Sequence, residues 1–293
     1  MTTLVTGWFS FEEMGATAGD LIARNLLCDW LASAGESYDV AVAPPFRGGV
    51  DWRAVAPESY DQVVFVCGPF GNGPPITEFL PRFAHCRLIG VNLSMLQSLD
   101  EWDPFDLLIE RDSSRGSHPD LAFLGDSPLV PAVGVVQAHP QTEYGERGLH
   151  GAANDAMEQL LAGRELARFH IDTRLDIAEG GFRTSAEVES AIARMDAVVT
   201  TRLHGMVLAI KNGVPALAID PIAGGAKVAA QAATIGWPIC FVADSLDAEG
   251  LAEGLAFCLS QKARVAAREC AAEAERVVAE IRDRLISYVA GDR

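Results

Sequence analysis

The sequence predicts an α/β protein built from two Rossmann-like domains, each with a parallel sheet covered by helices. Short runs rich in β-branched and aromatic residues alternate with segments of helical periodicity along the chain. This alternation is typical of parallel strands joined by crossover helices. The length of 293 residues, 49% of them hydrophobic, suits two domains of roughly 150 residues. We place the boundary in the segment GDSPLVP, which gives domains 1–127 and 128–293, with a cleft between them.

The first domain alternates strands and helices from its first residues onward. Residues 18–35 carry apolar side chains at helical spacing and end at Gly35, and residues 75–84 predict a shorter helix. The Gly- and Pro-rich loop GPFGNGPP precedes that second helix, and its glycines let a backbone approach a substrate closely. Strands are expected at residues 3–8, 38–43, 60–68, 87–94 and 105–113.

The second domain repeats the alternation. Ser185 is the expected N-cap of a helix whose apolar residues share one face. Strands are expected at residues 130–138, 167–173, 197–201 and 215–220. Helices are expected at residues 148–163, 185–196, 203–213 and 226–235, and one or two more at 248–288.

Charge and cysteine content restrict the partners. With 23 Lys and Arg against 40 Asp and Glu, the formal charge is −17, which repels nucleic acid and anionic lipid surfaces. No signal peptide is apparent, and no apolar stretch is long enough for an integral membrane segment. The six cysteines lack CxxC or metal-ligand spacing, so we expect small, mostly buried side chains in a reducing compartment. These features predict a cytoplasmic protein without a metal or a resident cofactor.

The stretch VVTTRLHGMVLAI, residues 198–210, places two basic side chains at the end of a buried strand. In an open α/β sheet, ligands bind beyond the carboxyl ends of the strands, where helix N-termini expose free N–H groups. Thr201 and Arg202 lie at this junction, and His204 and Gly205 lie in the first helical turn. The helix dipole adds roughly +0.5 charge there, so this junction suits a small anion.

A third basic residue follows the next strand. The loop IAGGAK brings Lys227 to the start of the following helix, on the same edge of the sheet as Arg202 and His204. An arginine fork suits phosphate or carboxylate, and histidine can transfer a proton near neutral pH. Two plainer interpretations stay open at this point, namely that Arg202 pairs with a carboxylate and that His204 is structural.

Other candidate positions are less specific. Gly68 and Asn72 lie in the Gly-rich loop, which is either a substrate loop or an ordinary tight loop. Asp20 either caps its helix or orients a substrate hydroxyl. His139, at the end of a strand of the second domain, either faces the cleft or lies in a surface loop.

Residues 185–238 resemble the C-terminal signature of the polysaccharide pyruvyl transferase family. The resemblance rests on a helix, a strand ending in Thr, the Arg-Leu-His triplet, an apolar helix, Gly-Val-Pro, a further strand and a later Lys. Weaker similarity runs through TAGD at residues 17–20, which adds Gly19 beside Asp20, and through ERDSS at residues 110–114. The family's usual Asn is absent from TAGD, and the chain is shorter than many members.

The resemblance implies a fold similar to the glycosyltransferase B class, with the active site in the interdomain cleft. It implies transfer of the enolpyruvyl group of phosphoenolpyruvate, a donor co-substrate, onto two hydroxyls of a carbohydrate acceptor, which forms a cyclic ketal. Arg202 and Lys227 would hold the anionic donor, and His204 would be the general acid, with no metal required. The N-terminal domain would be the acceptor side.

Two other functions are compatible with the sequence. One is a nucleotide-sugar glycosyltransferase or epimerase of the same fold, in which the strand-to-helix junction holds a diphosphate. The other is a non-catalytic binding protein derived from this fold. A homo-oligomer is compatible with all three functions.

Overall fold

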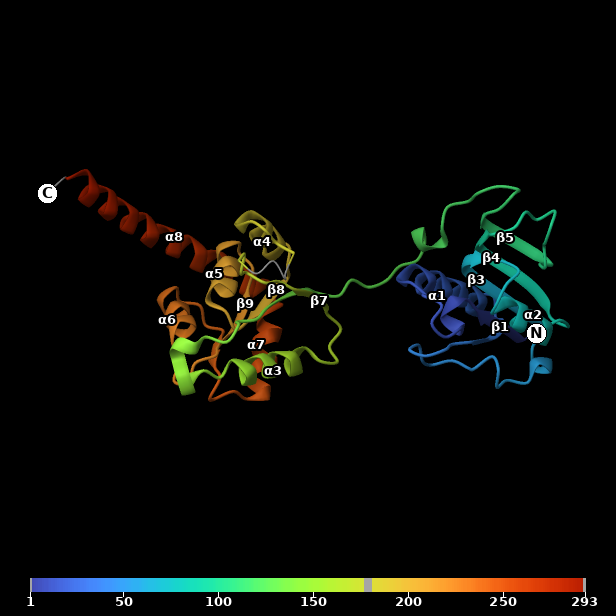
Figure 1. The fold of residues 1–293 in the computed structure, drawn as a ribbon, viewed down its shortest axis with the longest axis horizontal. Coiled ribbons are helices and arrows are strands. Elements are labelled where there is room, and N and C mark those ends of the chain that lie inside the picture. The colour runs from blue at the N-terminus through green and yellow to red at the C-terminus, as the bar shows by residue number, and fades with distance from the viewer. Residues whose placement is uncertain (1, 177–180, 292–293) are drawn as a thin grey trace. The chain divides into compact units, whose positions relative to one another are not determined.

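The computed structural model describes residues 2–176 and 181–291. The chain divides into two compact units, Met1–Pro128 and Leu129–Arg293, next to the boundary expected after residue 127. Each unit contains a five-stranded sheet whose paired strands are all parallel, accompanied by helices (Figure 1). The predicted α/β class with two parallel sheets is therefore confirmed.

In unit 1 the strand order is β2-β1-β3-β4-β5. The strands are β1 (Thr2–Thr6), β2 (Ser37–Val40), β3 (Gln62–Phe70), β4 (Arg87–Met95) and β5 (Leu107–Asp112). The helices are α1 (Ala18–Ser33) and α2 (Ile76–Arg82), and 3₁₀ turns form at Trp8–Ser10, Pro57–Ser59 and Leu121–Phe123.

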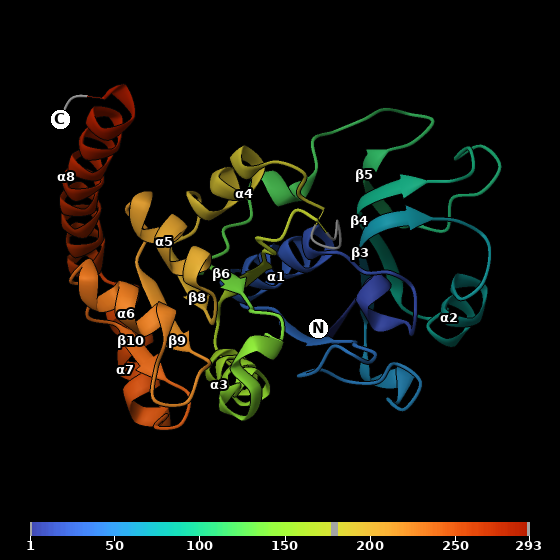
Figure 2. The same cartoon turned by 60° about the vertical axis from the view of Figure 1, so that its left-hand side comes forward.

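The sheet of unit 1 is buried on both faces, which explains the continuous apolar run of β3. Val64 and Val66 pack with residues of α1, whereas Val63 and Phe65 pack with residues of α2. Successive side chains of a strand point to opposite faces. The two helices therefore cover opposite sides of the sheet (Figure 2).

Two helix starts differ from the sequence-based expectation. Thr17, and not Asp20, is the N-cap of α1, and Asp20 closes a capping box by accepting hydrogen bonds from the Thr17 amide and hydroxyl. Thr184, and not Ser185, caps α4, with Glu187 completing the box. In both cases an acidic residue three positions into the helix accepts the cap's own N–H, so the cap lies one turn before that residue.

In unit 2 the strand order is β10-β9-β8-β6-β7. The strands are β6 (Ala132–Val136), β7 (Ala167–His170), β8 (Ala197–Thr200), β9 (Ala216–Asp220) and β10 (Cys240–Val242). The helices are α3 (His150–Leu161), α4 (Ser185–Ile192), α5 (Leu203–Lys211), α6 (Lys227–Thr234), α7 (Ala248–Cys258) and α8 (Gln261–Ala290), and a 3₁₀ segment spans Thr142–Arg147. The short edge strand β10 was not predicted, because its three residues are too few to show a periodic pattern.

The centre of this sheet is the most buried part of unit 2. Every residue of β8 and β9 is buried, and α5 packs against β8, α4, α6 and α8. Because β8 lies between β6 and β9, the loops after these three strands meet at one edge of the sheet. That edge carries the candidate site.

The last helix, α8, packs on unit 2 through Ala263 and Ala267 and then extends away from that unit as one long helix (Figures 1 and 2). Among the described residues, no helix has the length and apolar character needed to cross a membrane. The six cysteines are free thiols, of which Cys67 and Cys258 are buried and the other four are half-buried. Burial raises the pKa of Cys67 to about 11 and that of Cys258 to about 12.

Candidate functional site

A cavity of about 250 Å³ opens at the carboxyl edge of the unit 2 sheet, beyond β8 and β9. Its lining brings together five of the residues singled out in the sequence, namely His139, Thr201, Arg202, His204 and Lys227. Three strand-to-helix connections supply them, as the strand order requires. The side chains of His204 and Lys227 are exposed, so both are open to a ligand.

The junction between β8 and α5 is held by Thr200, whose side chain is fully buried. The Thr200 hydroxyl donates to the Val136 carbonyl at 2.9 Å and accepts from the Arg202 amide at 2.9 Å. Arg202 is the N-cap of α5 in an extended conformation, and no side chain caps this helix. The first N–H groups of α5 are therefore left for a ligand or water.

Gly205 fixes how closely α5 approaches the sheet. A Cβ atom at this position would lie 2.3 Å from the Thr200 hydroxyl oxygen and 2.9 Å from a methyl carbon of Val136. Only glycine fits without moving the helix. Gly205 is therefore a packing residue of the site, although it does not line the cavity.

Thr201 also serves mainly to hold the backbone. Its hydroxyl accepts from the Ala138 amide at 2.7 Å and donates to the Asn154 side chain at 2.9 Å. These bonds tie the ends of β6 and β8 to α3. Its side chain is 1% exposed, so we assign it to the frame of the cavity.

Arg202 forms an ion pair with a carboxylate, which was one of the two plainer interpretations of the sequence. Its Nη1 lies 3.1 Å from Oδ1 of Asp172, and the two side chains are 20% and 16% exposed. A guanidinium has five N–H donors in a planar fork, so this contact leaves donors for an anion. The ion pair and a ligand contact can therefore coexist.

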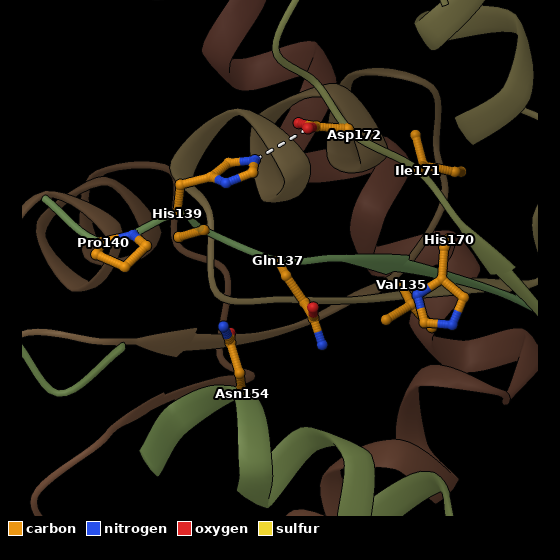
Figure 3. Close-up of a pocket in the computed structure, with 9 residues that line it drawn as sticks. Val135, Gln137, His139, Pro140, Asn154, His170, Ile171 and Asp172 are labelled. Atoms are coloured by element: carbon orange, nitrogen blue, oxygen red, sulfur yellow. Dashed lines mark hydrogen bonds and ion pairs between the residues drawn. The ribbon is translucent and has the colours of Figure 1, made fainter. Parts of the chain in front are cut away.

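Asp172 joins Arg202 to His139. Its second oxygen, Oδ2, lies 2.9 Å from Nε2 of His139 (Figure 3). Burial opposes ionisation of Asp172, but hydrogen bonds from the Arg174 amide and from His139 hold the pKa of this carboxyl below its usual value. Sequence reasoning missed Asp172, because nothing local marks one aspartate in a loop after a strand.

Asp220 organises the connection that carries Lys227. The carboxylate is fully buried and accepts hydrogen bonds from the amides of Ile222, Ala226 and Ala229 at 3.1, 2.8 and 2.9 Å. It thereby occupies the N-terminus of α6, which leaves α5 as the helix end open to an anion. Sequence reasoning also missed this residue, although an aspartate closing the apolar run PALAID was a usable signal.

Lys227 itself is the first residue of α6, and its Nζ lies 5.8 Å from the ring centre of Tyr144. The cavity thus combines the cationic side chains of Arg202 and Lys227 with the open end of α5, and Asp220, the carboxylate in its lining, is engaged by three backbone amides. Such a cavity favours a small anion.

A second cavity of about 440 Å³ lies beside the first, beyond β6 and β7 (Figure 3). Gln137, His139, Asn154, His170 and Asp172 contribute its polar lining. His139 lines both cavities. It therefore lies between the first cavity, which we call the anion cavity, and the larger polar one.

In unit 1, a cavity of about 650 Å³ brings together Asp20, Gly68 and Asn72. Gly19 lies in the first turn of α1 and is not in the lining. Gly68 has a φ of +85°, and a Cβ atom there would lie 2.1 Å from the ring of Trp8, which also lines the cavity. Gly68 lies within β3 and not, as was expected, in the loop after it, and glycine is needed there for the strand to pack on an aromatic ring.

His150, at the start of α3, is expected to make the stability of unit 2 depend on pH. It is 5% exposed, and its Nε2 makes no hydrogen bond to any described residue. Burial lowers the pKa of His150 below 6.5, and the charge of Lys227 lowers it further, against opposing effects of Glu143 and Asp220. A histidine with a lowered folded pKa contributes stability above its unfolded pKa of about 6.5, and this stability is lost as the pH falls through the folded pKa.

We therefore expect the thermal midpoint of unit 2 to fall between about pH 7.5 and about pH 5.5. The decline should be smaller in His150→Phe and unchanged in His170→Gln, which alters an exposed histidine of β7. Calorimetry at both pH values measures it, and an equal decline in His150→Phe and wild type would contradict this assignment.

Comparison with known proteins adds a family match. Residues 154–221 match the family model of the polysaccharide pyruvyl transferases, which confirms the resemblance over residues 185–221. The matched segment runs from α3 through β9 and contains Thr201, Arg202, His204 and Asp220. No curated protein matches the chain.

Several solved structures match this chain over most of its length, at low identity and low TM-score. The spinosyn rhamnosyltransferase SpnG is 12% identical, with 93% of this chain and 96% of that chain covered and a TM-score of 0.36. The UDP-GlcNAc 2-epimerase from Methanocaldococcus jannaschii is 9% identical, with 89% and 93% covered and a TM-score of 0.33. The glycosyltransferase SnogD from Streptomyces nogalater is 15% identical, with 95% and 98% covered and a TM-score of 0.29.

Within the described residues, no group of three or more His, Cys, Asp or Glu side chains is placed to hold a metal ion.

Proposed function

We propose that the protein is a pyruvyl transferase that moves the enolpyruvyl group of phosphoenolpyruvate onto a carbohydrate acceptor. The observation that carries this proposal is the anion cavity, in which Arg202, His204 and Lys227 line one space at the open N-terminus of α5. The family match covers the part of the chain that supplies Arg202 and His204.

Phosphoenolpyruvate suits this cavity because it carries a carboxylate and a phosphate. Arg202 can contact one anionic group with its planar fork, and Lys227 and the α5 amides can contact the other. His204, two residues after Arg202 and in the lining of the cavity, can donate a proton to the methylene carbon. Protonation makes the neighbouring carbon electrophilic, so that a hydroxyl can attack it.

For the part of the acceptor that does not react, we propose the cavity of unit 1. It offers the ring of Trp8, the carboxylate of Asp20 and the side chain of Asn72. Sites for small polar molecules combine apolar or aromatic surface with a few placed polar groups, and a sugar ring presents both kinds of surface. In this proposal unit 1 is the acceptor side and unit 2 the donor side.

The test is a calorimetric titration of the full chain with phosphoenolpyruvate and with a panel of nucleotide-diphosphate sugars. We expect phosphoenolpyruvate to bind, and at 100 times its Kd to add about 2.7 kcal/mol to the stability of the unit that binds it. Binding of nucleotide sugars without binding of phosphoenolpyruvate would favour the glycosyltransferase or epimerase alternative. Absence of phosphoenolpyruvate binding, with and without sugars, would overturn the proposal.

His204→Ala separates binding from chemistry. Because His204 is proposed to supply a proton and not the main anion contact, we expect Kd for phosphoenolpyruvate to change only a few-fold. Release of phosphate from phosphoenolpyruvate, measured with a panel of sugar acceptors, should fall by about 10²–10⁴. Phosphate release at the wild-type rate in His204→Ala would exclude it as the general acid.

A further inference from the structure

A three-residue chain of contacts crosses the wall between the two cavities of unit 2. Asp172 accepts from Arg202 with Oδ1 at 3.1 Å and contacts Nε2 of His139 with Oδ2 at 2.9 Å. The Asp172 side chain is 16% exposed, whereas the His139 side chain is 38% exposed. The largely buried Asp172 carboxylate thus holds the His139 ring, which stays accessible to a ligand.

The contact with Asp172 also determines which nitrogen of His139 carries a proton. An ionised carboxylate only accepts hydrogen bonds, so Nε2 must be the protonated nitrogen. In the neutral ring, Nδ1 then has a free lone pair. Figure 3 shows Nδ1 turned away from Asp172. The ring is therefore oriented as a base, with a carboxylate placed to stabilise the imidazolium formed when it takes a proton.

We infer that His139 is a second catalytic histidine, the general base that takes a proton from an acceptor hydroxyl, and that Asp172 is its positioning residue. This inference rests on the proposed function and gives the two histidines opposite tasks. The larger cavity, lined by Gln137 and Asn154 as well as His139, would take the reacting hydroxyl groups of a sugar. His139 lines that cavity and the anion cavity, so it lies where the two substrates would meet.

The steps balance with these two residues. In the first, protonated His204 gives its proton to the methylene carbon, the acceptor oxygen bonds to the neighbouring carbon, and the hydroxyl proton passes to His139. In the second, the bond from that carbon to the phosphate oxygen breaks, and phosphate leaves with the electron pair. The second hydroxyl then bonds to the same carbon and gives its proton to His204, while His139 returns its proton to the departing phosphate.

The first measurement needs no turnover. Nitrogen chemical shifts of the ring should show His139 protonated at Nε2 in the wild-type chain, at a pH where it is neutral. In Asp172→Asn the proton should no longer be confined to Nε2 of His139, because an amide can both donate and accept a hydrogen bond. Asp155→Asn is the matched control, since it removes one exposed carboxylate from α3 of the same unit. A proton on Nδ1 in the wild type, or an unchanged ring in Asp172→Asn, would overturn the role of Asp172.

The second measurement is phosphate release from phosphoenolpyruvate with a sugar acceptor. His139→Gln should lower kcat by about 10²–10⁴ and change KM for phosphoenolpyruvate only a few-fold. Asp172→Asn should also lower kcat, and Asp172→Glu should restore part of it. In His139→Gln, a purely structural role of the histidine would instead weaken donor binding and leave kcat little changed.

The outcomes separate the two proposals. If the wild-type chain turns over phosphoenolpyruvate and His139→Gln does so equally fast, the base assignment fails while the proposed function stands. If the wild-type chain neither binds nor turns over phosphoenolpyruvate, the proposed function fails and the base assignment fails with it.

Discussion

Replacing Arg202 with alanine should abolish measurable binding of phosphoenolpyruvate at concentrations that saturate the wild-type chain. Arg202 is the anchored guanidinium of the anion cavity, 20% exposed and held by Asp172 at 3.1 Å. Removing one partner of a desolvated charge pair costs about 2–5 kcal/mol, which corresponds to a Kd at least about 30-fold higher. Calorimetric titration of the full chain measures this change.

Two further variants make the result specific. Arg202→Lys keeps the charge and loses the planar fork, so its Kd should lie between those of the wild type and Arg202→Ala. Arg194→Ala is the matched control, because it removes an exposed arginine that bonds to the Ser190 carbonyl at the end of α4. Equal affinities of Arg202→Ala and Arg194→Ala would show that Arg202 does not bind the donor.

Replacing Asp220 with alanine should cause the largest loss of stability among the substitutions considered. The Asp220 carboxylate is fully buried and accepts hydrogen bonds from two amides of the loop between β9 and α6 and from the Ala229 amide in the first turn of α6. A buried donor left without an acceptor costs about 1–3 kcal/mol. We expect Asp220→Ala to lower the free energy of unfolding of unit 2 by about 3–5 kcal/mol and its thermal midpoint by about 10 °C.

Scanning calorimetry of the full chain measures the midpoint, and hydrogen exchange of peptides from residues 221–234 locates the change. Asp244→Ala is the control, because its exposed carboxylate accepts one hydrogen bond, at 2.7 Å, from the same loop at Gly224. It should shift the midpoint by a small fraction of the Asp220→Ala effect. Equal shifts in both variants would mean that the buried carboxylate does not organise the loop.

The arrangement of elements could be predicted because its signals are local. The apolar run of residues 63–67 and the helical spacing of residues 18–33 are each visible within one segment, and both elements form there. The junction at Arg202 could be predicted for the same reason, since a strand, a polar step and an apolar helix follow one another directly. The cap of α4 was misplaced by one residue because Thr184 and Ser185 are equally good caps by residue type.

Asp172 could not be predicted, because its importance depends on strand order. The order β8-β6-β7 places the loop after β7 beside those after β6 and β8, although Asp172 is far from His139 and Arg202 in sequence. Periodicity identifies strands but does not indicate which strands are neighbours. The bridge from His139 to Arg202 therefore appears only once the sheet is assembled.

The sequence by itself determined the two parallel α/β units and the basic junction at the end of β8, because alternation, periodicity and the order of residues at a junction are properties of one segment. Only the tertiary structure decided that Asp172 pairs with Arg202 and holds His139, that Asp220 occupies the start of α6, and that Gly205 lets α5 approach the sheet. Each of these contacts joins elements that strand order and close packing bring together. The role of a buried charge, or of a glycine at a close approach, depends on the group that it contacts in the folded structure.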